Sequence, residues 1–395
     1  MIGAEKMAME LCFATARVLG GPGCIGNVDH LKKLIVGSEV AAVIDPFLLS
    51  TSALDRFKSG VKTICGTEPR LILAPAQEPD IADVSQMAHD LAKQGFDTLF
   101  VIGGGSAIDT AKAARMCLAN KGSPEDVAAL GLSMRNHSSR FIAAPTTAGT
   151  GSEVTEFAVF NKAGEPIKIV FHSQDMAPYC ALLDAELSIT APKSVTAAAG
   201  FDALTHAVEA FIANRSNPIT DALAVDAIKR LVKYLPVAFN EPKSLRARDE
   251  CLTAACQAGL AFNSAGLGLA HALSAPLGVR WHVAHGLANA LALPAVMAFN
   301  APSIGDKESQ LAQLFNARNS VEGIARLRFE LGLDMSLDDF VPTADEREEL
   351  ALASLHSKQV ANNPRPAQIN DLRAVIEAMR APTGAGGGGL MKCFA

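Results

Sequence analysis

Short apolar runs alternate with longer stretches of helical spacing through the first half of the chain, and no other feature constrains its fold as much. The predicted strands are residues 40–44, 71–74, 98–102 and 141–144. The predicted helices are residues 47–58, 81–94 and 106–119. Strands that alternate with helices of this length form βαβ units. The pattern therefore predicts an N-terminal Rossmann-like α/β domain, in which helices cover both faces of a parallel sheet and a nucleotide binds.

From about Leu187 onward the strand signals disappear and long Ala-rich segments follow a helical period. The predicted helices there are residues 197–213, 219–234 and 246–261. Because proline lacks an amide donor, five prolines are expected to end helices. They are Pro236, Pro242, Pro276, Pro294 and Pro302. We predict a dinucleotide-binding domain at residues 1–184, an all-helical metal-binding catalytic domain at 185–382 and a flexible glycine-rich tail at 383–395, with a ligand in the cleft between the domains.

Composition excludes several classes of protein. The chain has 35 Lys and Arg against 41 Asp and Glu, a formal net charge of −6, so nucleic acid is excluded as the main partner. The most apolar stretch, residues 287–299, is shorter than the ~20 residues that cross a bilayer. Glu5 and Glu10 lie where a secretory signal carries only positive charge before an apolar run, and the eight cysteines form no CxxC pair. We therefore expect reduced thiols and a cytoplasmic protein without a membrane segment.

A glycine-rich turn follows the strand at residues 98–102. It consists of Gly103, Gly104, Gly105 and Ser106, and a helix that contains Asp109 begins directly after it. Glycines let a diphosphate approach the backbone, and the first-turn amides of a helix favour an anion. The turn lacks the GxGxxG fingerprint, so a tight strand-to-helix turn without a ligand is the alternative interpretation.

A second polar loop, at residues 146–153, follows the strand at 141–144 and contains Thr146, Thr147 and Thr150. Open α/β sheets bind ligands at the carboxyl ends of their strands, so two such loops favour a shared site. An ordinary polar turn is the alternative. Asp45 ends the strand at 40–44, where it either accepts a hydrogen bond from a ribose hydroxyl or serves as a turn residue before Pro46.

Four residues of the helical half form a candidate metal site. Asp202 and His206 are four positions apart and therefore project from one helix face. His271 and His285 are separated by fourteen residues that include a proline, so they are expected on different elements. One carboxylate and three imidazoles suit Fe²⁺ or Zn²⁺. Each histidine taken singly is also compatible with an ordinary core or surface position.

These motifs together resemble the iron-containing (group III) alcohol dehydrogenase family, within the dehydroquinate-synthase-like superfamily, from about Val40 to Asp371. The resemblance rests on GGGSAIDTAK at 103–112, APTTAGTGSEVT at 144–155, GFDALTHAVEAF at 200–211, the segment around His271, HGLANA at 285–290 and NPRP at 363–366.

The resemblance implies NAD(P) bound by the first half of the chain and a metal bound by the second. It implies a cofactor site at Asp45, Gly103, Gly104, Gly105, Ser106, Asp109, Thr146, Thr147, Thr150 and Lys168. It implies metal ligation by Asp202, His206, His271 and His285. A carboxylate at Asp45 implies a preference for NAD over NADP, because it would repel a 2′-phosphate. Lys168 is similar to a lysine near the nicotinamide and is assigned a catalytic place there, with an exposed surface lysine as the alternative.

One position departs from the family pattern. Many members carry a second histidine four residues after the third ligand, where this chain has Ala275. That histidine is associated with proton transfer. His282, three residues before His285, is the candidate for a similar role, and an exposed histidine is the alternative.

The resulting hypothesis is a metal-dependent NAD(P)-linked oxidoreductase that interconverts a small primary or secondary alcohol and its aldehyde or ketone by hydride transfer. The expected metal is Fe²⁺, with Zn²⁺ as the alternative, and a homodimer or higher homo-oligomer is expected. A polyol (glycerol-type) dehydrogenase stays open. An NAD-dependent lyase acting on a polyanion is disfavoured, because residues 262–290 offer only Arg280 as a cation. A catalytically silent nucleotide-binding protein is disfavoured by the intact ligand set.

Overall fold

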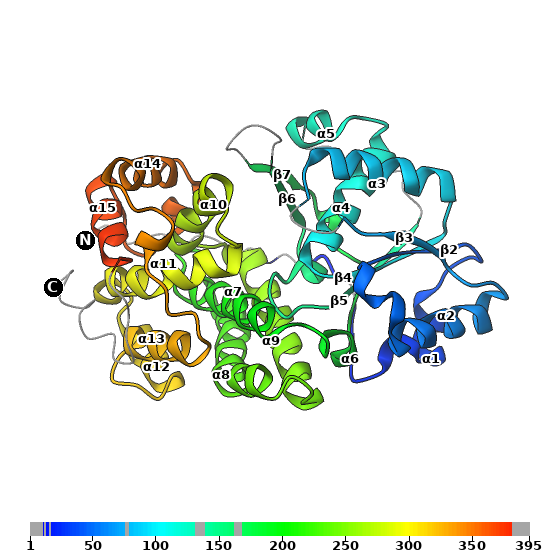
Figure 1. Cartoon of the computed structure of the whole chain (residues 1–395), viewed down its shortest axis with the longest axis horizontal. Coiled ribbons are helices and arrows are strands. Elements are labelled where there is room, and N and C mark those ends of the chain that lie inside the picture. The colour runs from blue at the N-terminus through cyan, green and yellow to red at the C-terminus, as the bar shows by residue number, and fades with distance from the viewer. Residues whose placement is uncertain are drawn as a thin grey trace.

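The computed structural model describes residues 11, 13–15, 17–75, 79–130, 139–161 and 168–380. It shows an α/β part and a helical part side by side (Figure 1). The α/β part contains a six-stranded sheet in the order β1-β8-β5-β4-β2-β3, and every neighbouring pair of strands is parallel. Its strands are β1 (Arg17–Gly20), β2 (Val40–Ile44), β3 (Arg70–Leu73), β4 (Thr98–Gly103), β5 (Arg140–Pro145) and β8 (Cys180–Leu183).

Helices cover both faces of this sheet, as the alternating pattern predicts. One face packs against α1 (Val28–Leu34) and α2 (Ser52–Cys65). The other face packs against α3 (Ile81–Gln94) and α4 (Gly105–Asn120), with α5 (Pro124–Leu130) beside them. β2 and β4 are buried along their whole length, which fits their continuous apolar sequences.

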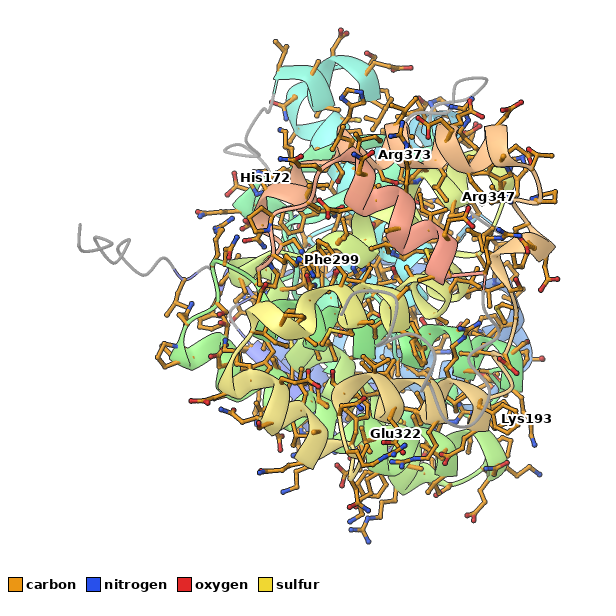
Figure 2. All side chains as sticks on the ribbon, turned by 90° about the vertical axis from the view of Figure 1, so that its left-hand side faces the viewer. His172, Lys193, Phe299, Glu322, Arg347 and Arg373 are labelled. Carbon is orange, nitrogen blue, oxygen red and sulfur yellow. The ribbon has the colours of Figure 1, made fainter. Side chains whose placement is uncertain are left out.

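The helical part follows β8 (Figure 1). It contains one large apolar core. Its helices are α6 (Ala185–Ser188), α7 (Lys193–Ile212), α8 (Pro218–Asn240), α9 (Leu245–Ala265), α10 (Leu269–Trp281), α11 (His285–Asn300), α12 (Asp306–Leu314), α13 (Ser320–Glu330), α14 (Ala344–Leu355) and α15 (Ile369–Ala378). Viewed from the helical end of the molecule, the charged side chains of Glu322, Arg347 and Arg373 lie around the buried Phe299 (Figure 2). No helix in the described part of the chain combines the length and hydropathy that crossing a membrane requires.

Several sequence predictions need correction. The four predicted strands are present, but β1, β8 and the antiparallel hairpin of β6 (Phe157–Asn161) and β7 (Lys168–His172) were not predicted. The predicted helix at 47–58 is two elements: a 3₁₀ turn at Pro46–Ser50, and α2, which begins after Thr51 because that hydroxyl accepts from the amide of Leu54. The predicted tail at 383–395 lies outside the described residues.

Three of the five prolines do not end helices, so that prediction is wrong for them. Pro236, Pro276 and Pro294 lie inside α8, α10 and α11. An internal proline costs about 3 kcal/mol through its lost hydrogen bond and ring clash. Burial offsets this cost in α11, where every residue from 288 to 300 is buried. Pro242 lies between α8 and α9, and Pro302 lies in a 3₁₀ turn after α11.

Candidate functional site

The two predicted phosphate loops meet at the carboxyl edge of the sheet. Gly103 at the end of β4 pairs with Pro145 at the end of β5, and its carbonyl accepts from the amide of Thr146 at 3.1 Å. Asp45 lies between the loops, where Oδ2 accepts from the amide of Gly104 at 2.9 Å and from the hydroxyl of Thr146 at 3.2 Å. Burial raises the pKa of Asp45. The structure therefore joins the ends of three strands at one polar edge.

Close packing of the two loops explains a glycine requirement. A Cβ on Gly105 would lie 2.5 Å from the hydroxyl oxygen of Thr150, so only glycine fits beside that loop. Gly105 is the first residue of α4, one residue earlier than the sequence predicts, and no side chain caps this helix end. Ser106 is exposed there. The first-turn amides of α4 thus face an edge that suits an anionic group.

Asp109 lies one turn into α4 and contacts the hairpin that follows the second loop. Its Oδ2 accepts from the amide of Val159 in β6 at 3.2 Å, and its Oδ1 lies 3.8 Å from Nζ of Lys112. Lys112 is fully buried and donates to the hydroxyl of Thr155 and to the carbonyl of Phe157. Burial lowers the pKa of this lysine and raises that of Asp109. The pair joins α4 to the hairpin, and a place for Asp109 at the cofactor stays a prediction.

The four predicted metal ligands come together in the helical part. Asp202 and His206 share one face of α7, His271 lies on α10 and His285 begins α11. Their ligand atoms all lie within 4.8 Å of one another. Oδ1 of Asp202 lies 3.8, 3.8 and 3.6 Å from Nε2 of His206, His271 and His285, respectively. One turn of α7 and the N-terminal ends of α10 and α11 therefore bring these four side chains together.

The chemistry of this donor set fits a divalent transition-metal ion. Burial lowers the pKa of His206 to about 4 and that of His285 to about 3, so both rings are neutral near pH 7 and carry a lone pair. The Nδ1 atoms of both rings are buried without a hydrogen-bond partner among the described residues. Three imidazoles around one carboxylate match the preferences of Fe²⁺ and Zn²⁺.

Glu209 supports this centre and was missed from the sequence. Its carboxylate is 1% exposed and accepts from the amides of Gly268 at 3.0 Å and Ala270 at 2.6 Å. The same group lies 2.6 Å from Nδ1 of His271. A carboxylate at Nδ1 keeps the proton there and leaves the Nε2 lone pair for a metal. The spacing could have indicated this role, because Glu209 follows His206 by three residues and so lies on the same face of α7.

Asn289 is a second neighbour that was missed from the sequence. Its Nδ2 lies 2.6 Å from Oδ1 of Asp202 and 3.1 Å from Nε2 of His271, while its Oδ1 is buried without a partner among the described residues. The amide directs its electropositive end at the predicted ligand atoms. It follows His285 by four residues, which places it on the same face of α11.

The two residues assigned catalytic places are found in different settings. Lys168 begins β7, and its positive charge adds to the burial that lowers the pKa of His285. His282 is exposed and adopts a left-handed conformation at the end of α10. No hydrogen bond or ion pair in the described part of the chain joins its side chain to the four clustered residues. A proton role for His282 stays a prediction.

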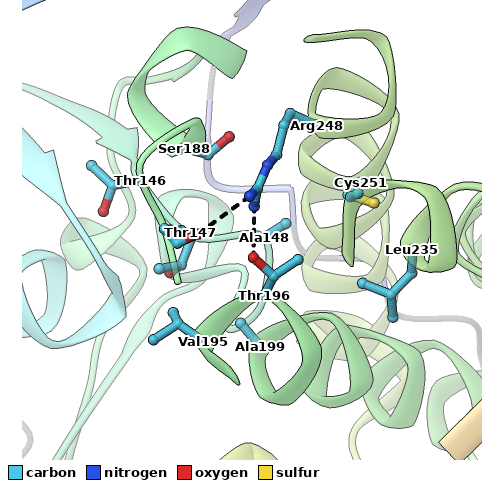
Figure 3. A pocket seen from close by; sticks show the side chains of 12 residues that line it. Thr146, Thr147, Ala148, Ser188, Val195, Thr196, Ala199, Leu235, Arg248 and Cys251 are labelled. Carbon is cyan, nitrogen blue, oxygen red and sulfur yellow. Dashed lines mark hydrogen bonds between the residues drawn. The ribbon is translucent and has the colours of Figure 1, made fainter. Parts of the chain in front are cut away.

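A small pocket lies beside the second loop (Figure 3). Its walls include Thr146, Thr147, Val195, Ala199, Arg248 and Cys251. Arg248 is buried and donates to the hydroxyl of Thr196 at 2.8 Å and to the carbonyl of Ala191 at 3.3 Å (Figure 3). The guanidinium therefore ties α9 to the start of α7 behind this pocket.

The spacing of α7 and α11 leads to a prediction for Gly286, directly after His285. A Cβ there would overlap the carbonyl oxygen of Ala198 in α7. Gly286→Ala is expected to lower the free energy of unfolding by about 1–3 kcal/mol through overpacking. It should also weaken metal affinity, because it pushes His285 away from Asp202. Gly278→Ala is the control, since its nearest contact is an ordinary 3.4 Å. Equal unfolding and metal-binding curves for the two variants would contradict this account of the helix contact.

Comparison with known proteins agrees with this geometry. The family model described as iron-containing alcohol dehydrogenase matches residues 15–185, and the C-terminal model of the iron-containing alcohol dehydrogenase family matches residues 196–380. The probable alcohol dehydrogenase EutG of Escherichia coli (strain K12) is 38% identical over 91% of this chain and 92% of its own length. The NAD-dependent methanol dehydrogenase of Bacillus methanolicus is 31% identical over 90% and 96%, respectively.

Solved structures give the same result. The crystal structure of sulfoacetaldehyde reductase from Bifidobacterium kashiwanohense in complex with NAD⁺ superposes with a TM-score of 0.86 at 26% identity, covering 95% of this chain and 99% of that chain. The sequence likeness and the structural likeness therefore extend over both the α/β part and the helical part.

Proposed function

Because this chain belongs to the iron-containing alcohol dehydrogenase family, we propose that Asp202, His206, His271 and His285 bind its iron. The protein is a metal-dependent, NAD-linked alcohol oxidoreductase. The observation that carries the proposed ligand set is the convergence of three imidazole nitrogens on one buried carboxylate, within 4.8 Å. The assignment of residues 1–184 to the cofactor domain and 185–382 to the metal domain belongs to the same proposal.

The residues around the centre prepare it for hydride transfer. Bound iron supplies Lewis acidity toward the substrate oxygen, and NAD carries the hydride. Glu209 fixes the tautomer of His271, so that Nε2 is directed at the centre. The ring of Phe262 stacks on that of His206, with centroids 4.4 Å apart, and keeps water from this side of the site. The protein thereby holds the alcohol oxygen in a fixed place relative to the NAD bound at the carboxyl edge of the sheet.

We place NAD along the carboxyl edge of the sheet. The first-turn amides of α4 face the diphosphate, Thr147 and Thr150 lie beside it, and the carboxylate of Asp45 accepts from a ribose hydroxyl. Thr146 and Thr147 also line the small pocket of Figure 3, beside the proposed path of the cofactor. The positive charge of Lys168 contributes to the lowered pKa of His285, which supports a place for this lysine near the nicotinamide.

Asp45 gives a test of cofactor preference. Asp45→Asn keeps an oxygen that accepts from Gly104 and Thr146 but removes the negative charge. Repulsion of a 2′-phosphate by a nearby carboxylate is worth about 1–2 kcal/mol at intermediate dielectric, so kcat/KM for NADP⁺ is expected to rise about tenfold. The value for NAD⁺ should change much less. Steady-state kinetics with both cofactors decides this, and an unchanged NADP⁺/NAD⁺ ratio would remove Asp45 from specificity.

The proposed substrate is a small alcohol or aldehyde, with a polyol as the second candidate. Arg280, the lone cation in residues 262–290, pairs with Glu349 on α14, so it does not serve a polyanionic substrate. Oxidation of NADH with short aldehydes, compared with dihydroxyacetone, tests the proposal. Higher kcat/KM for the aldehydes supports a simple alcohol dehydrogenase. The reverse order would indicate a polyol enzyme, and no turnover with either would contradict the substrate class.

Location and assembly are part of the proposal. Six cysteines of the described residues are free thiols, which supports a reducing, cytoplasmic compartment. Among the described residues, the edge strands β1 and β3 each pair on one side only, which supports a homo-oligomer. Sedimentation equilibrium would show a mass that is a multiple of 41.3 kDa.

A further inference from the structure

Alcohol oxidation releases one proton per turnover, and this proton has to leave the metal centre. The C–H electron pair goes to C4 of the nicotinamide as hydride, the hydroxyl O–H bond breaks, and an oxygen electron pair completes the C=O bond. The proton from the hydroxyl is the remaining product. A side chain that exchanges it with water accelerates such a step about 10²–10⁴-fold.

The hairpin β6–β7 has one face in solvent. Phe157 pairs with His172 across the two strands, and alternation places Val159 and Val170 on the same face. These two valines are 40% and 50% exposed. The opposite face packs into the α/β core through Ala158, Phe160 and Phe171. The exposed face therefore combines apolar side chains with a histidine.

Two observations place this hairpin beside the metal centre. The amide of Glu156, directly before β6, donates to Oδ1 of Asn263 at 3.2 Å, and the preceding residue of α9 is Phe262, which stacks on His206. Phe157, the first residue of β6, also packs against the apolar core of the helical part. The end of the exposed face that carries Phe157 and His172 thus lies close to a predicted metal ligand, His206.

At the inner end of this face a buried carboxylate holds an exposed imidazole. Nε2 of His172 lies 2.9 Å from Oε1 of Glu156, and the side chains are 57% and 8% exposed, respectively. The imidazole also stacks on Phe157, with centroids 4.9 Å apart and planes 17° apart. His172 lies near the edge of the molecule seen from the helical end (Figure 2). A proton on Nε2 that bonds Glu156 leaves the lone pair of Nδ1 for water.

We propose that His172, held by Glu156, takes up the proton that alcohol oxidation releases and passes it to bulk water. Cleft water carries the proton from the hydroxyl to Nδ1, the imidazolium forms against the carboxylate of Glu156, and Nδ1 then returns the proton to solvent. Reduction of an aldehyde runs this sequence in reverse. The role rests on the proposed function. Glu156 is a positioning residue, because it acts through His172.

The test measures NAD⁺-dependent alcohol oxidation by the iron-loaded full-length enzyme in dilute, weakly proton-accepting buffer. His172→Gln is expected to lower kcat about a hundredfold, and added imidazole should restore the rate in proportion to its concentration. Glu156→Gln should give a smaller loss, because the amide oxygen still orients Nε2 without the charge. Iron content and the Kd of NADH should stay at wild-type values in both.

His89→Gln is the control, because His89 is exposed on α3, away from the centre, and its kcat should equal that of the wild type. A His172→Gln enzyme within twofold of the wild type overturns the proposal. So does a loss of rate that imidazole does not restore, including one that follows loss of iron, since the role would then be structural. A wild-type enzyme without NAD-linked turnover would instead contradict the proposed function.

Discussion

Asp202→Asn is expected to abolish iron binding and to lower kcat/KM at least about a thousandfold. Asp202 is the one anion among the four predicted ligands and lies within 3.8 Å of all three imidazole nitrogens. Metal Lewis acidity stabilises transition-state charge by several kcal/mol, and about 4 kcal/mol corresponds to a thousandfold. An amide of the same shape is a far weaker ligand, so the loss should be nearly complete.

The iron-free fold should survive this change. Burial keeps His206 and His285 neutral, so removing the carboxylate leaves no unpaired charge in the core. Thermal unfolding of the iron-free variant should therefore resemble that of the iron-free wild type, while metal analysis shows the loss. Asp345→Asn, an exposed position in the first turn of α14, is the control. Wild-type iron content in Asp202→Asn would remove this residue from the ligand set.

Glu209→Gln is expected to weaken iron affinity about 10–100-fold, the usual cost of losing a carboxylate behind a metal-bound histidine. In the native site this carboxylate faces two backbone amides and Nδ1 of His271. A glutamine side chain has one acceptor, so its NH₂ group must face a donor. The imidazole escapes this conflict by moving its proton to Nε2, the atom that has to bind the metal.

The measurement is equilibrium competition for Fe²⁺ against a chelator, without cofactor or substrate. Glu209→Asp retains the charge and should recover part of the affinity. Glu153→Gln is the matched control, since Glu153 is also a buried glutamate and burial raises its pKa to about 7. Its iron affinity should stay at the wild-type value. If Glu209→Gln also binds iron as the wild type does, the carboxylate does not fix the tautomer of His271.

Much of the fold follows from local sequence patterns. Continuous apolar runs such as residues 98–102 can be read as buried parallel strands, and Asp202 and His206 share a face through helical spacing alone. β1 and β8 are only four residues long, and β1 lies at the sheet edge, so their sequences carry little periodic signal. The buried prolines were misjudged because tertiary burial, which local sequence does not reveal, offsets their local cost.

The candidate site likewise has residues that sequence motifs predict and contacts that only the fold creates. Its motifs supply the proposed ligands, but the partners of those residues come from packing between distant elements. Glu209 contacts His271 across 62 positions, and His172 meets Glu156 only because β6 and β7 pair. Asp109 lies one turn into α4, where its carboxylate accepts from the amide of Val159 in the hairpin, and its place at the cofactor stays a prediction. Spacing along the chain therefore identifies functional residues better than it identifies their neighbours.

The central claim is that one iron, held by Asp202, His206, His271 and His285, supports NAD-linked turnover. The most direct measurement is metal analysis of anaerobically purified protein, paired with NADH oxidation on small aldehydes before and after chelation. We expect one iron per chain, loss of activity on chelation and recovery when Fe²⁺ is restored. Protein that stays active after its metal has been removed would contradict the claim.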